Sequence, residues 1–396
     1  MQRRRFVALG ATLSLAGHPA RAAQPVAAPA TAPATAPETG QRRLLVLLLR
    51  GAMDGLTAIP PIGDPALRLI RGNLVPAKLL PGTPFYAVHP ALPTFASLLA
   101  QGQALAVHAT GFGYRGRSHF EGQDIMQTGV AKAYTSASGW LGRAMERANL
   151  GNGVAISIPM PLILRGDARS ETQFPNWMPT PSDATYALVR DLWRTDPDLH
   201  PLGQRWVEGR SKTEPMLPVS GNFEQRKSPA GLACEAALRM LPSDGPMVGL
   251  IDFDGFDTHA SQGAAEGTHA TKLKMVDDVI KAFRETLGAR WADALVLTVT
   301  EFGRTAAENG TTGTDHGWGS CILAAGGLVK SAGVVADWPG LDKAQLFEGR
   351  DLAVTVDAAA VYAQALQTIF GLTPDQIQAG VLAHRPHALT SSLFVA

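Results

Sequence analysis

The segment LVLTVTEFGRTAAENGTTGTDHGWGS (295–320) joins an apolar run to residues that are able to bind a metal. The apolar run ends on Glu301, and a loop rich in Gly and Thr then leads to Asp315 and His316. Carboxylates and imidazoles are the side chains that divalent metal ions use as ligands in proteins. The ligand types alone do not distinguish zinc, manganese or calcium.

Two other apolar runs of the chain also end on acids. The run RLLVLLLRGAMDG leads to Asp54, and MVGLIDFDGFDTHA leads to Asp254, Asp257 and His259. Ligands of parallel α/β sheets bind beyond the carboxyl ends of the strands, where neighbouring strand ends lie close together. We therefore expect these side chains to converge with Glu301 in one pocket that holds one or two divalent metal ions.

The segment RSHFEGQD places Ser118 and His119 where a helix is predicted to begin. Ser118 followed by Glu121 fits a capping box, in which the serine hydroxyl bonds the helix backbone. A serine at a helix N-terminus also faces the positive end of the helix dipole, which favours an anionic phosphate or sulfate. Ser118 is therefore a candidate nucleophile as well as a candidate cap, and His119 is a candidate ligand, orienting group or packed histidine.

Arginines flank both of these segments. Arg304 follows Glu301, and Arg115 and Arg117 precede Ser118. A guanidinium binds phosphate, sulfate or carboxylate through two parallel hydrogen bonds, so these arginines are candidates for holding an anionic substrate. Surface ion pairing is the alternative role for each of them.

The elements that must position these residues are predicted to be strands alternating with helices. Apolar runs of about four to eight residues that close on polar residues and glycine are typical of strands buried in a parallel sheet. Such runs lie within 43–55, 104–111, 247–255 and 294–303. Apolar residues at helical spacing predict helices over roughly 270–288 and near the C-terminus. The fold class is therefore α/β, a central mostly parallel sheet flanked by helices, and the segment of about 151–245 is predicted to be an inserted cap.

The N-terminal segment predicts export. It has a basic start, a short apolar stretch and an Ala-Arg-Ala ending at Ala22, and its RRRFV motif resembles the twin-arginine pattern. We expect a signal peptide over 1–22, a Pro/Ala-rich linker over 23–41 and a folded domain over 42–396. The twin-arginine export machinery would deliver the chain to the periplasm or the medium, and the mature chain would have no transmembrane helix.

Composition and two further motifs narrow the possible functions. A net charge of +1, with no basic stripe after the N-terminus, argues against a nucleic-acid binder. Cys234 and Cys321 match no metal spacing, so free thiols and a single disulfide both remain open. The sequence GFGYRG (111–116) matches a dinucleotide fingerprint, but it follows the second predicted strand and lacks the acid expected about twenty residues later. A Rossmann-type dehydrogenase is therefore not expected.

Five motifs together carry a resemblance to a known family. They are LRGAMDGL, YRGRSHFEGQD, FDTHA, TEFGRT and TDHGWG. Over residues 43–396 the chain resembles the bacterial exported family of domain of unknown function 1501, which is grouped with the alkaline phosphatase and sulfatase-like superfamily. The resemblance implies an alkaline phosphatase-like fold, and it implies no particular substrate.

The resemblance also implies two metal positions with a nucleophile between them. One metal would be held by Asp257, His259 and His316, and the other by Asp54 and Glu301, with Ser118 as the nucleophile.

Two departures from the superfamily pattern affect this ligand set. Phe302 stands where the superfamily usually has a histidine after the acid equated with Glu301, which leaves His119 as a candidate to complete the second site. The spacing between Asp257 and His259 is shorter than usual, so Asp254 is an alternative ligand to Asp257.

The sequence thus predicts an exported metal-dependent hydrolase that acts on a phosphate or sulfate ester, with an anionic small molecule or polymer as substrate. Ser118, His119 and Arg304 are its predicted catalytic residues. The alternative is a secreted binding or assembly protein on the same fold, with a structural or vestigial metal site.

Overall fold

Strand β1 (Arg43–Leu49) lies in the middle of the sheet and is buried along its whole length. It pairs in parallel with β5 (Val248–Phe253) on one side and with β6 (Ala294–Val299) on the other. Alternate side chains of a strand point to opposite faces of the sheet. One set faces each core: Leu44, Val46 and Leu48 belong to the first, and Leu45, Leu47 and Leu49 to the second. Both faces of β1 are therefore covered, which explains why its sequence is continuously apolar.

The computed structural model describes residues 41–175, 182–201, 203–204, 223–382, 389 and 391–395. These residues fall within the compact unit Thr39–Ala396. The predicted signal peptide and nearly all of the predicted linker lie outside the described residues.

Among the described residues, the sheet has nine strands in the order β4-β3-β5-β1-β6-β7-β2-β8, with β9 paired to β2. Strand β7 runs antiparallel to both β6 and β2, and the other pairs are parallel. The predicted mostly parallel α/β sheet is confirmed. The remaining strands are β2 (Ala104–Gly111), β3 (Gly153–Ile156), β4 (Ser170–Thr172), β7 (Ser320–Ala325), β8 (Gly333–Val335) and β9 (Val356–Asp357).

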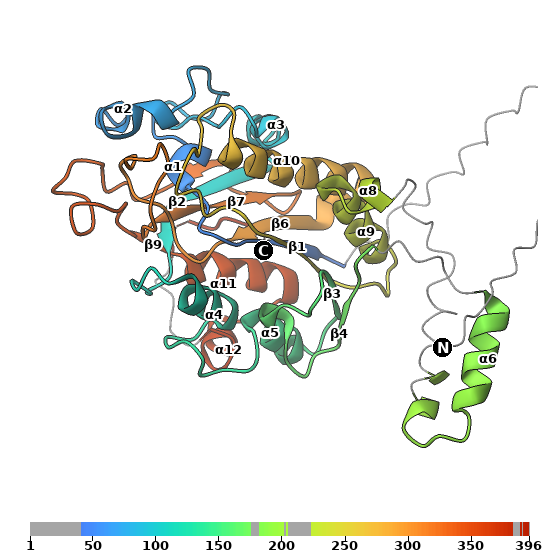
Figure 1. The fold of residues 1–396 in the computed structure, drawn as a ribbon. Helices are drawn as coiled ribbons and strands as arrows, with labels where there is room; N and C mark the ends of the chain where they lie inside the picture. Colours follow the sequence, from blue (N-terminus) through green and yellow to red (C-terminus); the bar gives the residue numbers. More distant parts are fainter. Residues whose placement is uncertain are drawn as a thin grey trace, which may run out of the picture. The chain divides into compact units, whose positions relative to one another are not determined.

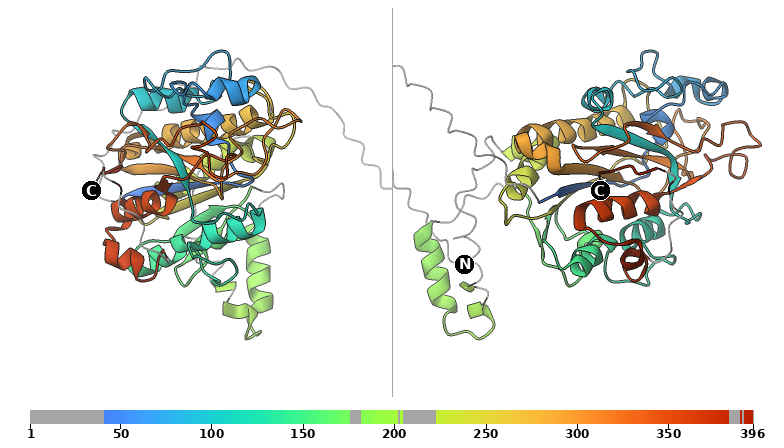
Figure 2. Two further views of the ribbon diagram at one scale, coloured as in Figure 1. Left: turned by 90° about the vertical axis from the view of Figure 1, so that its left-hand side faces the viewer. Right: turned by 180° about the vertical axis from the view of Figure 1, so that it is seen from behind.

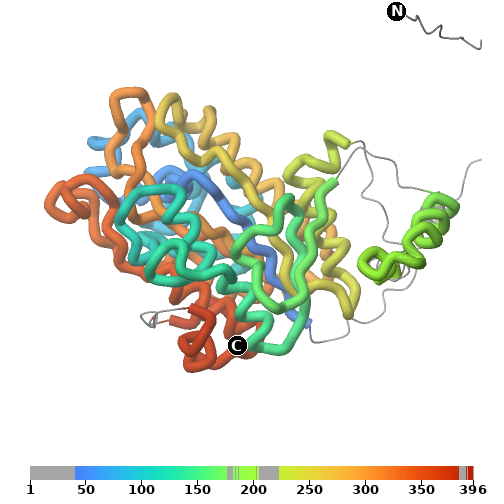
Figure 3. Tube along the Cα trace, turned by 60° about the horizontal axis from the view of Figure 1, so that its bottom comes forward, coloured from blue at the N-terminus to red at the C-terminus, as the bar shows by residue number. Residues whose placement is uncertain are grey.

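Helices cover both faces of this sheet, as Figures 1 and 2 show. Helices α3 (Pro93–Ala100) and α10 (Thr268–Leu287) lie over one face, and α10 packs on α9 (Pro229–Met240). Helices α4 (His119–Thr128), α5 (Trp140–Ala148), α11 (Ala358–Phe370) and α12 (Pro374–Gln378) lie under the other. Figure 3 views the molecule from this second side, where α5 and α11 pack together.

Seven further helices complete the described part of the chain. They are α1 (Gly55–Ala58), α2 (Leu67–Arg71), η1 (Gly72–Leu74), η2 (Leu162–Leu164), α6 (Asp183–Trp193), α8 (Phe223–Arg226) and η3 (Gly288–Asp293). Among the described residues, no helix combines the length and the apolar character needed to cross a bilayer. Cys234 and Cys321 are both free thiols.

The segment 151–245, predicted as an inserted cap, contributes to the central sheet. Its strand β3 pairs with β5, and β4 extends the edge beyond β3. Its helix α9 packs on β5 as well as on α10. The boundaries of the insertion remain a prediction.

Candidate metal centre

Four side chains form a cluster beyond the carboxyl ends of β5 and β6; we call His119, Asp257, His259 and His316 the histidine cluster. The Nε2 atom of His316 lies 3.0 Å from that of His119 and 2.9 Å from that of His259. Asp257 carboxylate oxygens lie 3.3 Å from Nε2 of His119, 3.1 Å from that of His259 and 3.2 Å from that of His316. Asp257 and His316 are therefore the two members that contact every other member.

In each of the three histidine rings, the hydrogen bond at Nδ1 fixes the tautomer. A carboxylate or a carbonyl oxygen only accepts hydrogen bonds, so an Nδ1 atom facing one must carry a proton. The three acceptors are Glu301 for His119 at 2.8 Å, Asp315 for His259 at 3.0 Å and the Arg117 carbonyl for His316 at 2.8 Å. With Nδ1 protonated, each neutral imidazole directs an Nε2 lone pair into the cluster.

This donor set fits a divalent metal ion. Three lone pairs and a carboxylate that face one another repel unless a cation or a proton lies between them. Metal-ligating histidines characteristically donate their other ring N–H to a carboxylate or carbonyl, as all three rings do here. Zinc–nitrogen bonds of about 2 Å in tetrahedral geometry separate ligand atoms by about 3.3 Å. The ligand atoms of His119, Asp257 and His316 lie within 4.8 Å of one another, which is close enough to share one ion.

The protonation preferences of the two innermost histidines differ. Burial alone would lower the pKa of His119, but the hydrogen bond and charge of Glu301 and the charge of Asp257 raise it above its ordinary value. The pKa of His316 is lowered by burial and by repulsion from His119. Burial would raise the pKa of Asp257, but the Arg304 guanidinium outweighs it and the pKa is lowered. Asp257 is therefore ionised, as a metal ligand must be.

Glu301 acts on the cluster through His119. Its carboxylate is buried and its Oε1 accepts three hydrogen bonds, from His119, from the Gly51 backbone at 2.8 Å and from Gln123 at 3.1 Å. Burial would raise the pKa of Glu301, but the hydrogen bond from His119 and those from the backbone and Gln123 lower it. An ionised Glu301 holds the His119 ring in place, and the ring of Phe302 stacks on its face at 4.9 Å between centroids.

Gly51 allows the end of β1 to approach the loop that carries Asp257. Its φ of 107° lies in the region that favours glycine, and a Cβ atom there would lie 2.5 Å from the backbone nitrogen of Asp257. The same glycine accepts a hydrogen bond from Arg304 and donates one to Glu301. A side chain at this position would displace both partners.

Arg304 positions Asp257 from behind. Its guanidinium is fully buried, with Nη1 2.6 Å from Asp257 Oδ1 and further hydrogen bonds to the Thr314 hydroxyl and carbonyl. Arg304 was predicted to be catalytic by holding a substrate anion. Its buried placement does not favour that role. A guanidinium with no exposed surface cannot contact a substrate, and this one orients the proposed metal ligand Asp257 instead.

The carboxylate of Asp54, predicted to hold a second metal, faces a buried arginine. Arg71 donates to it through two parallel hydrogen bonds of 2.9 and 2.7 Å, and Gln262 and Thr57 donate at 2.6 and 2.7 Å. Asp54 also caps α1 by accepting from the Leu56 backbone. Burial would raise the pKa of this carboxyl, but Arg71 and its other partners hold the pKa well below its usual range. Arg71 therefore supplies the positive charge for which the family resemblance implied a metal.

Of the two alternative aspartates after β5, the structure brings Asp257 to the cluster. The Asp254 side chain is 94% exposed, and its ion-pair partner is Lys272 at 3.9 Å. The Asp254 carboxylate therefore lies outside the cluster, and this residue is not brought together with the histidines.

Ser118 stands at the N-cap position of α4 but makes no side-chain capping hydrogen bond. Its backbone nitrogen donates to the Tyr114 hydroxyl at 3.1 Å, and Glu121 accepts from that same hydroxyl at 2.8 Å. The predicted capping box is therefore wrong, because Tyr114 occupies Glu121. Ser118 is the residue immediately before His119, a member of the histidine cluster.

Sequence reasoning missed the partners that arrange these groups. In the sequence Asp315 is simply the residue before His316, but in the structure it orients the ring of His259. Gln262 links Asp54 to Thr258 and Thr314 through three hydrogen bonds of 2.6 to 2.7 Å. Nothing in the spacing of Arg71 or Gln262 indicated these contacts. The TDH motif did place Asp315 beside a histidine.

The comparisons place the chain in a family. The model of the family described as "Protein of unknown function (DUF1501)" matches residues 82–381, more than half of the chain. The chain belongs to this family, as its motifs predicted. No curated protein matches it.

Several solved structures resemble the chain distantly. The sulfatase PsFucS1 from Pseudoalteromonas sp. is 11% identical with a TM-score of 0.39, over 85% of this chain and 69% of that one. The phosphonate monoester hydrolase of Agrobacterium radiobacter is 12% identical with a TM-score of 0.35, over 84% and 74%. Ps i-CgsB, solved in complex with k-i-k-neocarrahexaose, is 11% identical with a TM-score of 0.43, over 85% and 74%. Similarities of this size carry no function, which depends on the geometry of the site.

Proposed function

We propose that the chain holds a divalent metal ion in the histidine cluster and uses it to hydrolyse a phosphate or sulfate ester. The observation that carries the proposal is the set of three Nε2 atoms, each with its Nδ1–H engaged, around one ionised carboxylate. Asp257, His119 and His316 are the proposed ligands, and His259 is the proposed fourth. Glu301 and Asp315 orient two of the rings.

A divalent metal held there would polarise an ester oxygen and lower the pKa of a water molecule. The N-terminus of α4 directs backbone N–H groups toward an anion bound beside His119. Ser118, at that N-terminus, is the proposed nucleophile, and the attacking group is water if the serine is dispensable. Arg304 keeps Asp257 ionised and in place.

Metal titration of the full chain tests the ligand set. After removal of metal with EDTA, the protein is titrated with Zn²⁺, Mn²⁺ or Ca²⁺, and bound metal is counted by elemental analysis. We expect tight binding of at least one ion, lost in both His316→Ala and Asp257→Asn, because these residues contact every other cluster member. His200→Ala, outside the cluster, is the matched control. Unchanged affinity in His316→Ala would contradict the proposal.

Turnover separates the hydrolase from its alternative, a secreted binding or assembly protein with a structural metal. The observation that favours the alternative is the pairing of Asp54 with Arg71, which leaves one metal position where the superfamily pattern implied two. Metal-loaded protein is offered nitrophenyl phosphate and nitrophenyl sulfate. Metal-dependent release of nitrophenol that disappears in His316→Ala supports the hydrolase. Tight metal binding without turnover of either ester supports the alternative.

A further inference from the structure

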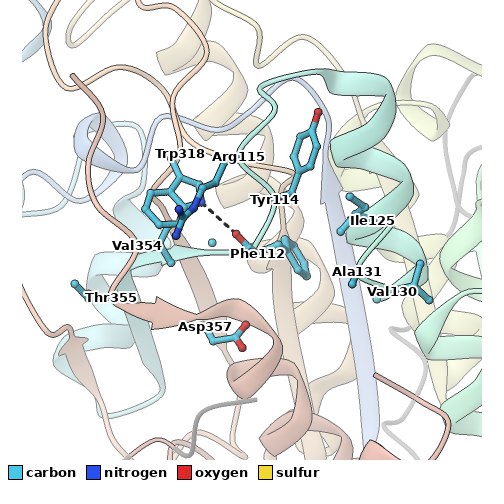
Figure 4. Close-up of a pocket in the computed structure, with 13 residues that line it drawn as sticks. Phe112, Tyr114, Arg115, Ile125, Val130, Ala131, Trp318, Val354, Thr355 and Asp357 are labelled. Atoms are coloured by element: carbon cyan, nitrogen blue, oxygen red, sulfur yellow. Dashed lines mark hydrogen bonds between the residues drawn. The ribbon is translucent and has the colours of Figure 1, made fainter. Parts of the chain in front are cut away.

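A pocket of about 420 Å³ is lined by residues of the segment 111–115, of helix α4 and of the segment that follows α4 (Figure 4). The GFGYR part of the dinucleotide-like motif forms one wall of this pocket. Trp318 and Arg115 line the pocket on one side, and Ile125, Val130 and Ala131 on the other. A volume of this size suits a small organic ligand, and mostly apolar walls with few polar groups are typical of such sites.

Segments that line this pocket also carry residues of the histidine cluster or their hydrogen-bond partners. Trp318 follows His316 by two residues, a span of at most about 7 Å of extended chain. Ile125 belongs to α4, the helix that begins with His119. The loop that carries Arg115 continues to Arg117, whose carbonyl accepts the Nδ1–H of His316 at 2.8 Å. Segments that line the pocket therefore also carry His316, His119 and the partner carbonyl of His316.

Arg115 carries the pocket's positive charge. Its guanidinium carbon lies 4.7 Å from the Trp318 ring centroid and 5.2 Å from that of Phe347. Within the described part of the chain, no carboxylate lies within ion-pair distance of Arg115. Other arginines near the cluster form ion pairs: Arg304 with Asp257, Arg117 with Asp351 and Glu348, and Arg50 with Asp252. A stacked guanidinium that keeps its hydrogen-bond donors free is suited to a planar anion such as a carboxylate.

Asp357 is the acidic residue of the pocket lining. Its carboxylate also lines the cavity, and it caps α11 by accepting the Ala359 N–H at 2.9 Å. The lining thus offers one stacked guanidinium, Arg115, beside the apolar wall of Ile125, Val130 and Ala131.

We propose that this pocket binds the alcohol half of the ester substrate, an aromatic or similarly flat apolar group that carries one carboxylate paired with Arg115. The assignment to a substrate rests on the proposed function. Recognition of an apolar molecule that carries a carboxylate does not rest on the proposed function, because it depends only on Arg115, Trp318 and the apolar wall.

Binding to the metal-free full chain tests the pocket without catalysis. Isothermal titration in EDTA compares 2-naphthoate with its neutral analogue 2-naphthamide. We expect naphthoate to bind about tenfold more tightly, because a stacked guanidinium adds a charge-assisted contact. Arg115→Met should remove this preference, Arg115→Lys should keep part of it, and Ala131→Trp should weaken both ligands by filling the cavity. Arg68→Met, an exposed arginine on α2, is the matched control. Equal affinities of the wild type for naphthoate and naphthamide would overturn the proposed carboxylate site. A preference for naphthoate that survives Arg115→Met would also overturn it.

Kinetics test the link to the reaction. With metal-loaded protein, Arg115→Met should raise KM about tenfold for 6-carboxy-2-naphthyl phosphate, with unchanged kcat and unchanged KM for 2-naphthyl phosphate. An equal effect on both esters would overturn the role of Arg115 in substrate selection. If wild type turns over neither ester but still prefers naphthoate, the proposed function fails while the carboxylate pocket stands.

Discussion

At the scale of single residues, the orientation of the imidazoles decides what the cluster can bind. Glu301 and Asp315 each accept a hydrogen bond from the Nδ1–H of one histidine. Without these acceptors the rings are free to rotate or to adopt the other tautomer. The two acids are therefore positioning residues.

We expect Glu301→Gln and Asp315→Asn each to lower metal affinity by about 10- to 100-fold, the usual cost of losing such a partner. Metal titration of each variant measures the effect. Asp254→Asn, an exposed acid outside the cluster, is the matched control and should bind metal as the wild type does. If Glu301→Gln abolishes binding as completely as His316→Ala, Glu301 is itself a ligand.

Ser118 allows a sharp test because its side chain does not cap α4. Ser118→Ala should cost less than the roughly 1 kcal/mol of stability that loss of a serine cap usually costs. If Ser118 is the nucleophile, the same variant should lose all ester turnover. Urea unfolding and nitrophenyl ester hydrolysis are measured on one preparation. Full turnover in Ser118→Ala would leave water as the attacking group.

At the scale of elements, the Asp54–Arg71 pair joins the start of α1 to the end of α2. Both side chains are buried, at 1% and 0% exposure. Removing one partner of a buried ion pair leaves an uncompensated charge in the interior. The carboxylate that β1 delivers is therefore part of the scaffold behind the site.

Arg71→Met should destabilise the protein by about 3–5 kcal/mol, because Asp54 loses its cation. Asp54→Asn should also destabilise it, but without changing the number of metal ions bound per chain. Urea unfolding gives the first quantity and elemental analysis the second. A lower metal content in Asp54→Asn would return Asp54 to the ligand set.

At the scale of the whole molecule, buried neutral histidines predict sensitivity to acid. Burial lowers the pKa of His108 and of His269 to about 4. His108 satisfies both ring nitrogens only when neutral, donating to the Ile59 carbonyl and accepting from the Ala109 N–H. His269 has no hydrogen-bond partner for either nitrogen among the described residues.

Because the unfolded chain binds these protons near pH 6.5, it takes up more protons than the folded chain as the pH falls. Stability should therefore be full above pH 6.5 and decline toward pH 4, by on the order of 3 kcal/mol per histidine. Urea unfolding in EDTA at pH 7, 5.5 and 4.5 measures it, with metal release excluded. His269→Met should flatten the decline and His200→Met should not. An equal decline in both variants would contradict the assignment.

Export also concerns the whole chain. If residues 1–22 form a twin-arginine signal, mass spectrometry of the exported protein should find a chain that begins after Ala22. Replacing Arg4 and Arg5 together with lysine should keep the protein inside the cell. Retention of Met1–Ala22 on exported protein would contradict the predicted cleavage.

The sequence by itself determined the fold class and the family. Continuous apolar runs identify strands buried on both faces, and β1, β5 and β6 lie where these runs predicted. Strand ends are local features, so their acids and histidines are readable from the order of residues. The histidines of the FDTHA and TDHGWG motifs were identified in this way.

Only the tertiary structure decided which charges meet. Asp54 and Glu301 look alike in sequence, since each closes an apolar run, but Asp54 is paired with Arg71 and Glu301 with His119. Asp254 and Asp257 are three residues apart, and one is in solvent while the other touches three histidines. The physical reason is that a side chain's partners come from segments far apart in the chain. Packing sets the distance between those segments, and residue spacing along any one segment carries no record of it.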